Sequence, residues 1–194
     1  YNMPADNISR AIKKGTGELG ASTYEEITYE GYAAGGVGIV VTALTDNRNR
    51  AASEIRHIFT QQGSSFAAQG SVSRNFQRKG QILVDCKVVA EDKLMDIVLN
   101  AGADDMQVDG DQYEILTDPS AFSGVVDALA KANIPTLSAE VGLIPTLYAP
   151  VADKTVAQSV VRFVAALEDN DDVQNVYTNM DLDDSVAALL EGEG

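Results

Sequence analysis

The segment Thr45–Arg50, with the sequence Thr-Asp-Asn-Arg-Asn-Arg, carries the residues best suited to bind an anion. It joins an apolar run typical of a strand to a periodic run typical of a helix. Asp46 and Asn47 are natural N-cap residues, so Arg48 and Arg50 fall at the positive end of a helix dipole, where each cation is unfavourable by roughly 0.3–1 kcal/mol. A phosphate bound at this helix start would reverse that penalty. The segment therefore predicts a phosphate-binding site.

A second interpretation gives the two arginines a structural role. Asp46 precedes them and Glu54 follows one helical turn later, so carboxylates of the same segment can neutralise both cations. Exposed ion pairs and dipole effects are too weak to decide between the two roles. Both interpretations stay open at this stage.

Further basic residues lie around residue 79. Two strands are predicted, residues 71–78 and 81–86, with a tight turn at Lys79–Gly80 between them. The even spacing of Arg74 and Arg78 places them on one face of the first strand as a small basic ridge. With two lysines at the end of a short predicted helix near the start of the chain, the candidates for nucleic-acid binding are Asn47, Arg48, Arg50, Arg74, Arg78, Lys79, Lys13 and Lys14.

The charge of the chain is strongly two-sided. The formal net charge is −15, but residues 1–87 hold 10 of the 14 Lys and Arg and only 8 of the 29 Asp and Glu. The first part therefore has a net charge of +2 and residues 88–194 have −17. A basic-leaning part can approach phosphate, while the acidic part repels it and solubilises the protein.

Little in the sequence favours an enzyme. The sole histidine, His57, lies on the polar face of the predicted helix, and no nucleophile is placed beside it by the sequence. Residues 15–20 match the dinucleotide pattern G-x-G-x-x-G, but a helix precedes them and a strand follows, the reverse of what that motif needs. One cysteine, Cys86, makes a disulfide or a Cys/His zinc site implausible. We expect no catalytic residue, metal, cofactor, small-molecule substrate or membrane span.

The first part of the chain predicts a hairpin and a helix. Residues 25–32 and 37–44 read as paired strands joined by a turn. Residues 51–62 place apolar side chains at helical spacing and end at Gly63, a residue suited to a left-handed stop. The arginine segment thus lies where the hairpin ends and the helix begins.

The next part predicts the order β-α-β-β-α-β. Strands at 82–84 and 136–141 flank the set, a hairpin turns at 109–111, and Pro119 opens the second of two helices. This is the element order of a ferredoxin-like plait. A helix and a strand that follow the complete plait are expected to return to the first domain.

The predicted fold class is α+β, with two α/β domains and the ferredoxin-like plait inserted into the other. The expected limits are residues 1–80 with 150–181 for the discontinuous domain, 81–149 for the acidic plait, and 182–194 for an acidic tail with a frayed end.

Several motifs resemble the YebC family, and the match spans nearly the whole chain. The Thr45–Arg50 segment is the most specific piece. The others are Met3–Ile8, Arg10–Gly17, Tyr29–Tyr32 with Gly35–Gly36, Gly70–Val72 and Arg78–Gly80.

The resemblance implies a regulator of gene expression that is not an enzyme. It implies a three-domain protein in which a basic helical N-terminal domain, absent from this chain, precedes two α/β domains. Members are described as DNA-binding transcriptional regulators or as ribosome-associated translation factors. We therefore expect a monomer that binds ribosomal RNA or DNA, in the bacterial cytoplasm or in the matrix of a mitochondrion or plastid. The alternative is a protein-interaction module that docks its acidic half on a basic partner.

Overall fold

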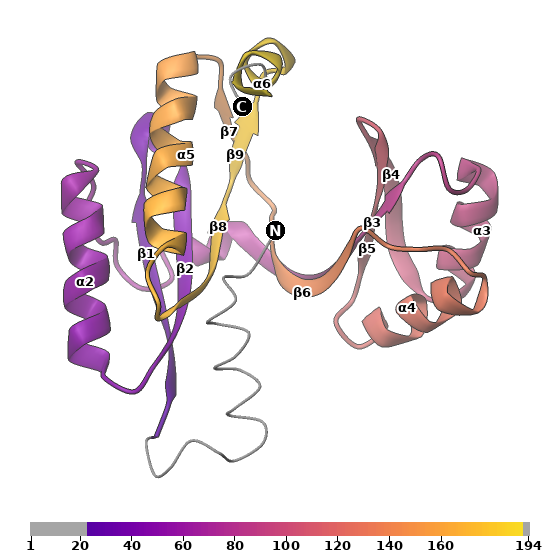
Figure 1. The fold of residues 1–194 in the computed structure, drawn as a ribbon, viewed down its shortest axis with the longest axis horizontal. Helices are drawn as coiled ribbons and strands as arrows, with labels where there is room; N and C mark the ends of the chain where they lie inside the picture. Colours follow the sequence, from indigo (N-terminus) through magenta and orange to yellow (C-terminus); the bar gives the residue numbers. More distant parts are fainter. Residues whose placement is uncertain (1–22, 192–194) are drawn as a thin grey trace. The chain divides into compact units, whose positions relative to one another are not determined.

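The computed structural model describes residues 23–191, which form two compact units. The first, here the split unit, contains the described residues up to Phe76 and again those from Pro145 onward. The second, the plait unit, is Gln77–Ile144. The chain therefore leaves the split unit once, forms the plait unit and comes back (Figure 1).

The split unit is built on a three-stranded antiparallel sheet in the order β1-β2-β8. Two helices, α2 and α5, cover one face of this sheet (Figure 1). The elements are β1 (Glu25–Tyr32), the 3-10 helix η1 (Ala34–Gly36), β2 (Gly38–Thr45), α2 (Arg48–Gln61), α5 (Lys154–Glu168) and β8 (Val173–Thr178). The predicted hairpin (β1 and β2), the predicted helix (α2) and the predicted returning strand (β8) are thus all present. Gly63 has the positive φ expected after α2.

The core of the split unit follows from periodicity. Alternate residues of β2 face the helices, and α2 and α5 each present one apolar stripe to them. The buried residues that meet there include Ile39, Val41, Ala43, Ile55, Phe59, Val160, Phe163 and Leu167. Because α5 and β8 complete this core, the sheet and helices of the first 76 residues depend on a segment that comes after the plait.

Gly31 allows a close approach at the centre of this core. A Cβ at this position would collide with the ring of Phe59 and the carbonyl of Ser65. Phe59 lies edge to face with Phe163 at 4.8 Å and with Phe66 at 4.9 Å between ring centroids. A chain of aromatic contacts therefore runs from the core to the loop after α2.

The end of the chain is more ordered than a frayed tail. A two-stranded parallel sheet pairs β7 (Ala149–Val151) with β9 (Met180–Leu182), and α6 (Asp184–Glu191) follows. Val186 is 3% exposed and belongs to the core of the split unit. The expectation of a frayed end was wrong for this helix, because one apolar side chain finds a place in a core that the local sequence does not reveal.

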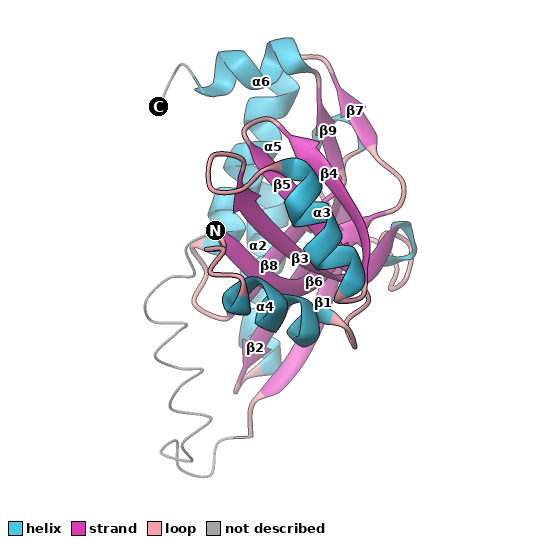
Figure 2. Cartoon of the chain, turned by 90° about the vertical axis from the view of Figure 1, so that its right-hand side faces the viewer, coloured by secondary structure: helices cyan, strands magenta, loops and turns pink. Residues whose placement is uncertain are grey.

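The plait unit has the sheet order β4-β5-β3-β6, with α3 and α4 on one face (Figure 2). Its elements are β3 (Phe76–Asp85), α3 (Glu91–Asn100), β4 (Ala103–Asp109), β5 (Gln112–Thr117), α4 (Phe122–Lys131) and β6 (Ser138–Pro145). This is the strand order of a ferredoxin-like plait, so the predicted α+β fold class is confirmed. The predicted turn at Gly110 is a two-residue connection between β4 and β5.

Three local predictions in this unit and in the segment that leads into it were wrong. Lys79–Gly80 is not a turn but the middle of β3, because a side chain at Gly80 would collide with Thr117 and Phe122 and only glycine fits there. The segment from residue 71 is no strand and contains the 3-10 helix η2 (Ser73–Asn75). Helix α4 begins at Phe122, after a turn at Asp118 whose carboxylate accepts hydrogen bonds from Ser120.

Candidate nucleic-acid interface

The start of α2 is capped as the sequence predicts. The Asn47 side chain accepts a hydrogen bond from the backbone N–H of Arg50 at 3.1 Å. Two residues before Asn47, the Thr45 hydroxyl accepts a hydrogen bond from the N–H of Asn47 at 3.0 Å. Local side chains therefore fix the direction in which the helix leaves β2.

Arg50 is held by two carboxylates, one of them far away in the sequence. One terminal nitrogen of its guanidinium lies 3.0 Å from Asp46 and 3.0 Å from Asp172. Asp172 is 4% exposed and also accepts a hydrogen bond from the Thr45 hydroxyl at 3.1 Å. The hydrogen bond and charge of Asp172 raise the pKa of Arg50 above its ordinary value. We call this group of Thr45, Asp46, Arg50 and Asp172 the Asp172 latch.

The Asp172 latch shows which carboxylates neutralise the charge of Arg50 at the start of α2. Asp46 pairs with Arg50 as the structural interpretation expected, but Glu54 does not, since it accepts a hydrogen bond from the Asn170 side chain instead. The second carboxylate comes from the turn before β8, which also binds β2 through the carbonyl of Asp172 and the N–H of Leu44. Arg50 therefore ties the returning segment to the helix start.

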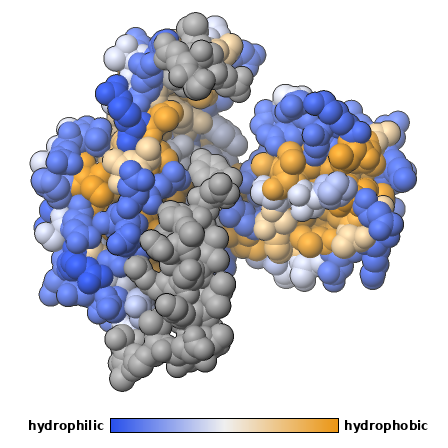
Figure 3. Space-filling model, viewed as in Figure 1, coloured by the Kyte–Doolittle hydropathy of each residue, from blue (hydrophilic) through white to orange (hydrophobic). Residues whose placement is uncertain are grey.

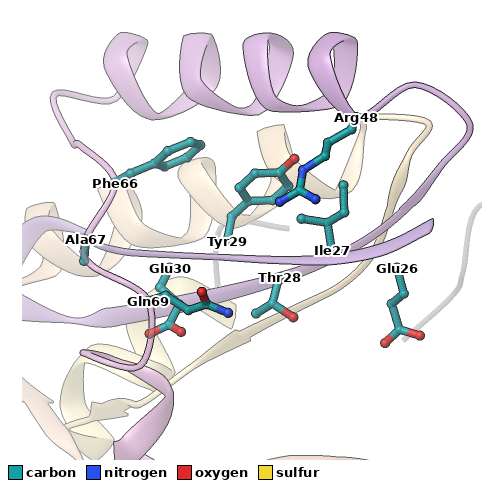
Figure 4. Close-up of a pocket in the computed structure, with 9 residues that line it drawn as sticks. All are labelled: Glu26, Ile27, Thr28, Tyr29, Glu30, Arg48, Phe66, Ala67 and Gln69. Atoms are coloured by element: carbon teal, nitrogen blue, oxygen red, sulfur yellow. The ribbon is translucent and has the colours of Figure 1, made fainter.

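Arg48 is the more available of the two arginines. Its side chain is 71% exposed, and its one ion pair in the described part of the chain is a 4.0 Å contact with the exposed Glu25. It extends from α2 toward β1 and lines a pocket of about 330 Å³ with Tyr29 and Phe66 (Figure 4).

A second arginine of α2 lies against the same aromatic pair. Tyr29 and Phe66 are stacked with centroids 5.3 Å apart, and the guanidinium carbon of Arg56 lies 5.2 Å from the centroid of Phe66. Burial raises the pKa of the Tyr29 phenol, while the charges of Arg48 and Arg56 oppose that shift. We call Tyr29, Arg48, Arg56 and Phe66 the arginine–aromatic strip.

The loop that carries Phe66 is anchored by a buried carboxylate. Glu30 is 5% exposed and accepts backbone N–H bonds from Gly70, Val72 and Ser73 at 2.8–2.9 Å, and one from the Ser73 hydroxyl. Burial alone would raise the pKa of Glu30, but these hydrogen bonds outweigh it and lower the pKa. The aromatic loop is thus held from the opposite side of β1.

The other predicted site residues are not brought together by one element. Arg74 is exposed on η2 in the split unit, whereas Arg78 and Lys79 belong to β3 of the plait unit. The predicted ridge of Arg74 and Arg78 on one strand was therefore wrong, because Arg74 precedes the strand. Lys79 pairs with Asp104 at 2.7 Å. Lys13 and Lys14 lie outside the described residues.

Sequence reasoning missed the residues that accompany Arg48. Arg56 stands two helical turns after Arg48, a spacing that returns to a neighbouring face of α2, and this was the available signal. Phe66 and Glu30 gave no such signal, since their roles arise from contacts between a loop and a strand about 36 residues apart.

Within residues 23–191 no group of three or more His, Cys, Asp or Glu side chains is arranged to hold a metal ion. No helix of the same residues is long and apolar enough to cross a membrane.

The fold and the site define an α+β protein of two units. Exposed arginines lie beside an aromatic pair on the split unit, and the plait unit is inserted into the sequence of the split unit. Residues 24–180 match the family described as TACO1/YebC second and third domain, and the chain belongs to this family. A probable transcriptional regulatory protein of Koribacter versatilis is 51% identical over 98% of this chain and 77% of its own length. One of Chlorobaculum tepidum is 46% identical over 99% and 76%.

A solved structure is similar throughout. The crystal structure of a conserved hypothetical protein from Aquifex aeolicus is 43% identical in sequence and has a TM-score of 0.78. The match covers 94% of this chain and 75% of that one. The family resemblance expected from the motifs is confirmed.

Proposed function

We propose that this protein is a non-enzymatic regulator of gene expression that contacts the backbone of a nucleic acid through the arginine–aromatic strip. The names of the relatives support a role in regulation. The main support for this proposal is that the arginines of α2 have different environments. Arg50 forms ion pairs with two carboxylates, while Arg48 and Arg56 remain exposed beside an aromatic pair. Guanidinium groups and aromatic faces side by side are a common way to bind single-stranded nucleic acid.

The chemistry of the strip favours a single strand over a duplex. Phosphates can pair with Arg48 and Arg56, and an unstacked base can lie beside Tyr29 and Phe66. Figure 3 shows mostly hydrophilic residues along the outer side of α2, at the left of that view. We therefore put ribosomal RNA ahead of duplex DNA as partner, and the bacterial cytoplasm ahead of an organelle because the relatives named above are bacterial.

The test is a salt series of binding to a labelled single-stranded RNA and to a DNA duplex. Replacement of Arg48 or Arg56 by Gln should each weaken RNA binding and reduce the slope of log affinity against log salt by about one. Arg162→Gln is the matched control, since Arg162 is an exposed arginine on α5 and its loss changes the net charge equally. Equal effects of all three variants would show that only net charge matters and would refute the proposed surface.

A second candidate, a module that docks on a basic partner protein, has its own support in the plait unit. This unit holds 5 Lys and Arg against 12 Asp and Glu. On the sheet face away from its helices, Glu114 accepts hydrogen bonds from Gln81 and Gln107. Co-sedimentation with ribosomes separates the two candidates: loss of association after nuclease treatment favours nucleic acid, and persistence favours a protein partner.

A further inference from the structure

The outer edge of β1 has a directional pattern of free backbone groups. The carbonyl of Glu30 accepts a hydrogen bond from the N–H of Ala67 at 2.8 Å, so this carbonyl points away from β2. In an antiparallel pair, residues two apart point their N–H and C=O groups to the same side. The backbone groups of Thr28 and Glu26 therefore also point to the outer edge.

This edge is only partly covered in the described structure. An isolated antiparallel bridge between Gly31 and Phe66 occupies one end of β1. Beyond it, Thr28 and Glu26 are exposed, and no residue of 23–191 bonds to their outward N–H and C=O groups. Such an edge can accept one more strand.

The pocket of about 330 Å³ lies along this open stretch and has two different sides (Figure 4). Toward α2, Ile27, Tyr29 and Phe66 form an apolar side, with the guanidinium of Arg48 beside it. On the other side of the strand, Glu26, Thr28 and Gln69 form a polar and acidic side. The Tyr29 hydroxyl at the pocket is buried and has no hydrogen-bond partner in the described chain.

We propose that β1 binds an extended peptide segment of a partner protein, which adds a strand opposite Glu25–Tyr29 and has alternating apolar and basic side chains. Strand addition supplies the missing backbone partners, and the alternation places apolar side chains beside Ile27 and Tyr29 and basic ones beside Glu26.

Charge argues for this occupant over two others. A nucleic acid along the strand edge would bring phosphates beside the carboxylates of Glu25 and Glu26. A second copy of β1 would bring those same acidic side chains against one another, a usual means by which edge strands avoid self-pairing. A basic segment is attracted by the exposed carboxylate of Glu26, while that of Glu25 already has Arg48 as a distant partner.

The test uses the full chain and a capped hexapeptide of alternating valine and lysine. Binding should protect the amide hydrogens of Glu26 and Thr28 from exchange, while those of Ile27 and Tyr29, already bonded to β2, should change little. Two control peptides are a block arrangement of the same residues and a version N-methylated at alternate peptide nitrogens. Equal binding of either control would overturn the proposal.

A matched pair of variants tests the edge itself. Thr28→Pro removes an outward N–H without touching the bonds between β1 and β2, and should weaken peptide binding by roughly tenfold, the effect of one lost hydrogen bond. Thr28→Val keeps the N–H and should bind as the parent does. Equal peptide binding by a folded Thr28→Pro chain would overturn the proposal, and the N-methylated peptide decides the matter if that chain does not fold.

Both proposals use Tyr29, but different variants test each of them. Thr28→Pro should leave RNA binding unchanged, and Arg56→Gln should leave peptide binding unchanged. Sedimentation of the free chain covers the remaining occupant: a concentration-dependent dimer that Thr28→Pro abolishes would assign the edge to a second copy and overturn the peptide proposal.

Discussion

Two buried carboxylates of the split unit, Asp172 and Glu30, each hold a segment that is distant in the sequence, but they are neutralised differently. Asp172 is paired with a guanidinium, that of Arg50. Glu30 accepts hydrogen bonds from backbone N–H groups and from the Ser73 hydroxyl, and no cation is among its hydrogen-bond partners in residues 23–191. The first arrangement consumes an arginine of α2, while the second secures the aromatic loop without one. Arg48 and Arg56 pair with neither of these carboxylates in the described chain and are exposed on α2.

The largest expected effect is on the Glu30 anchor. Glu30→Ala leaves three N–H groups of the 70–73 loop without their acceptor and should lower the free energy of unfolding by about 3 kcal/mol. Denaturant unfolding measures the change. Glu26→Ala, an exposed change on the same strand, should stay within about 0.5 kcal/mol. A similar loss in both variants would mean that Glu30 is no special anchor.

A somewhat smaller effect is expected at the latch. Asp172→Ala removes the acceptor of Arg50 and Thr45 and should lower the free energy of unfolding by about 2 kcal/mol, because Arg50 keeps Asp46 and partial access to water. Arg50→Gln should also destabilise, since it leaves a buried carboxylate without its cation. Unchanged thermal stability in Arg50→Gln would contradict the assigned role.

The pH dependence should follow the backbone-bonded carboxylate. The pKa of Glu30 is lower in the folded chain than its ordinary value of 4.5, so its contribution is complete above that pH and is lost as pH falls through the folded pKa. The parent should therefore lose stability on acidification from pH 5 more steeply than Glu30→Gln does. Denaturant unfolding at several pH values measures the stability of both proteins. Parallel curves of the free energy of unfolding against pH would contradict the prediction.

The smallest effect on stability is expected for the arginines of the strip. Arg48→Gln removes a cation from the positive end of α2 and a long 4.0 Å contact with Glu25. The free energy of unfolding should therefore change by no more than about 0.5 kcal/mol. Measured beside Arg50→Gln, this variant tests directly whether two arginines two residues apart have different tasks. A large loss of stability in Arg48→Gln would remove the distinction.

Much of the fold could be predicted because local signals agree with it. The Asn47 cap, the positive φ of Gly63 and the apolar stripe of α2 are local features, and the structure has all three. A turn was predicted at Gly80 because glycine is common in turns. In the structure Gly80 lies within β3, where the absence of a side chain allows close contact with Phe122. The burial of Val186 was not predicted either, because it depends on a core formed by segments distant in the sequence.

The candidate site was less predictable. The sequence points to the arginines of the α2 start but cannot tell which of them is consumed, since the partner of Arg50 stands 122 residues away. The stacking of Phe66 on Tyr29 depends on a loop whose path is set by Glu30. Contacts of this kind between distant segments have no signature in residue type or spacing.

The insertion of the plait also sets an order of events during synthesis. The plait unit is continuous in sequence, so it can fold as soon as residue 144 has been made. The split unit must wait, because β2 pairs on one side with β8, which is made last of its three strands. Until then β1, β2 and α2 expose the apolar residues that α5 later covers. The nascent chain therefore carries a finished second unit in front of an unfinished first one.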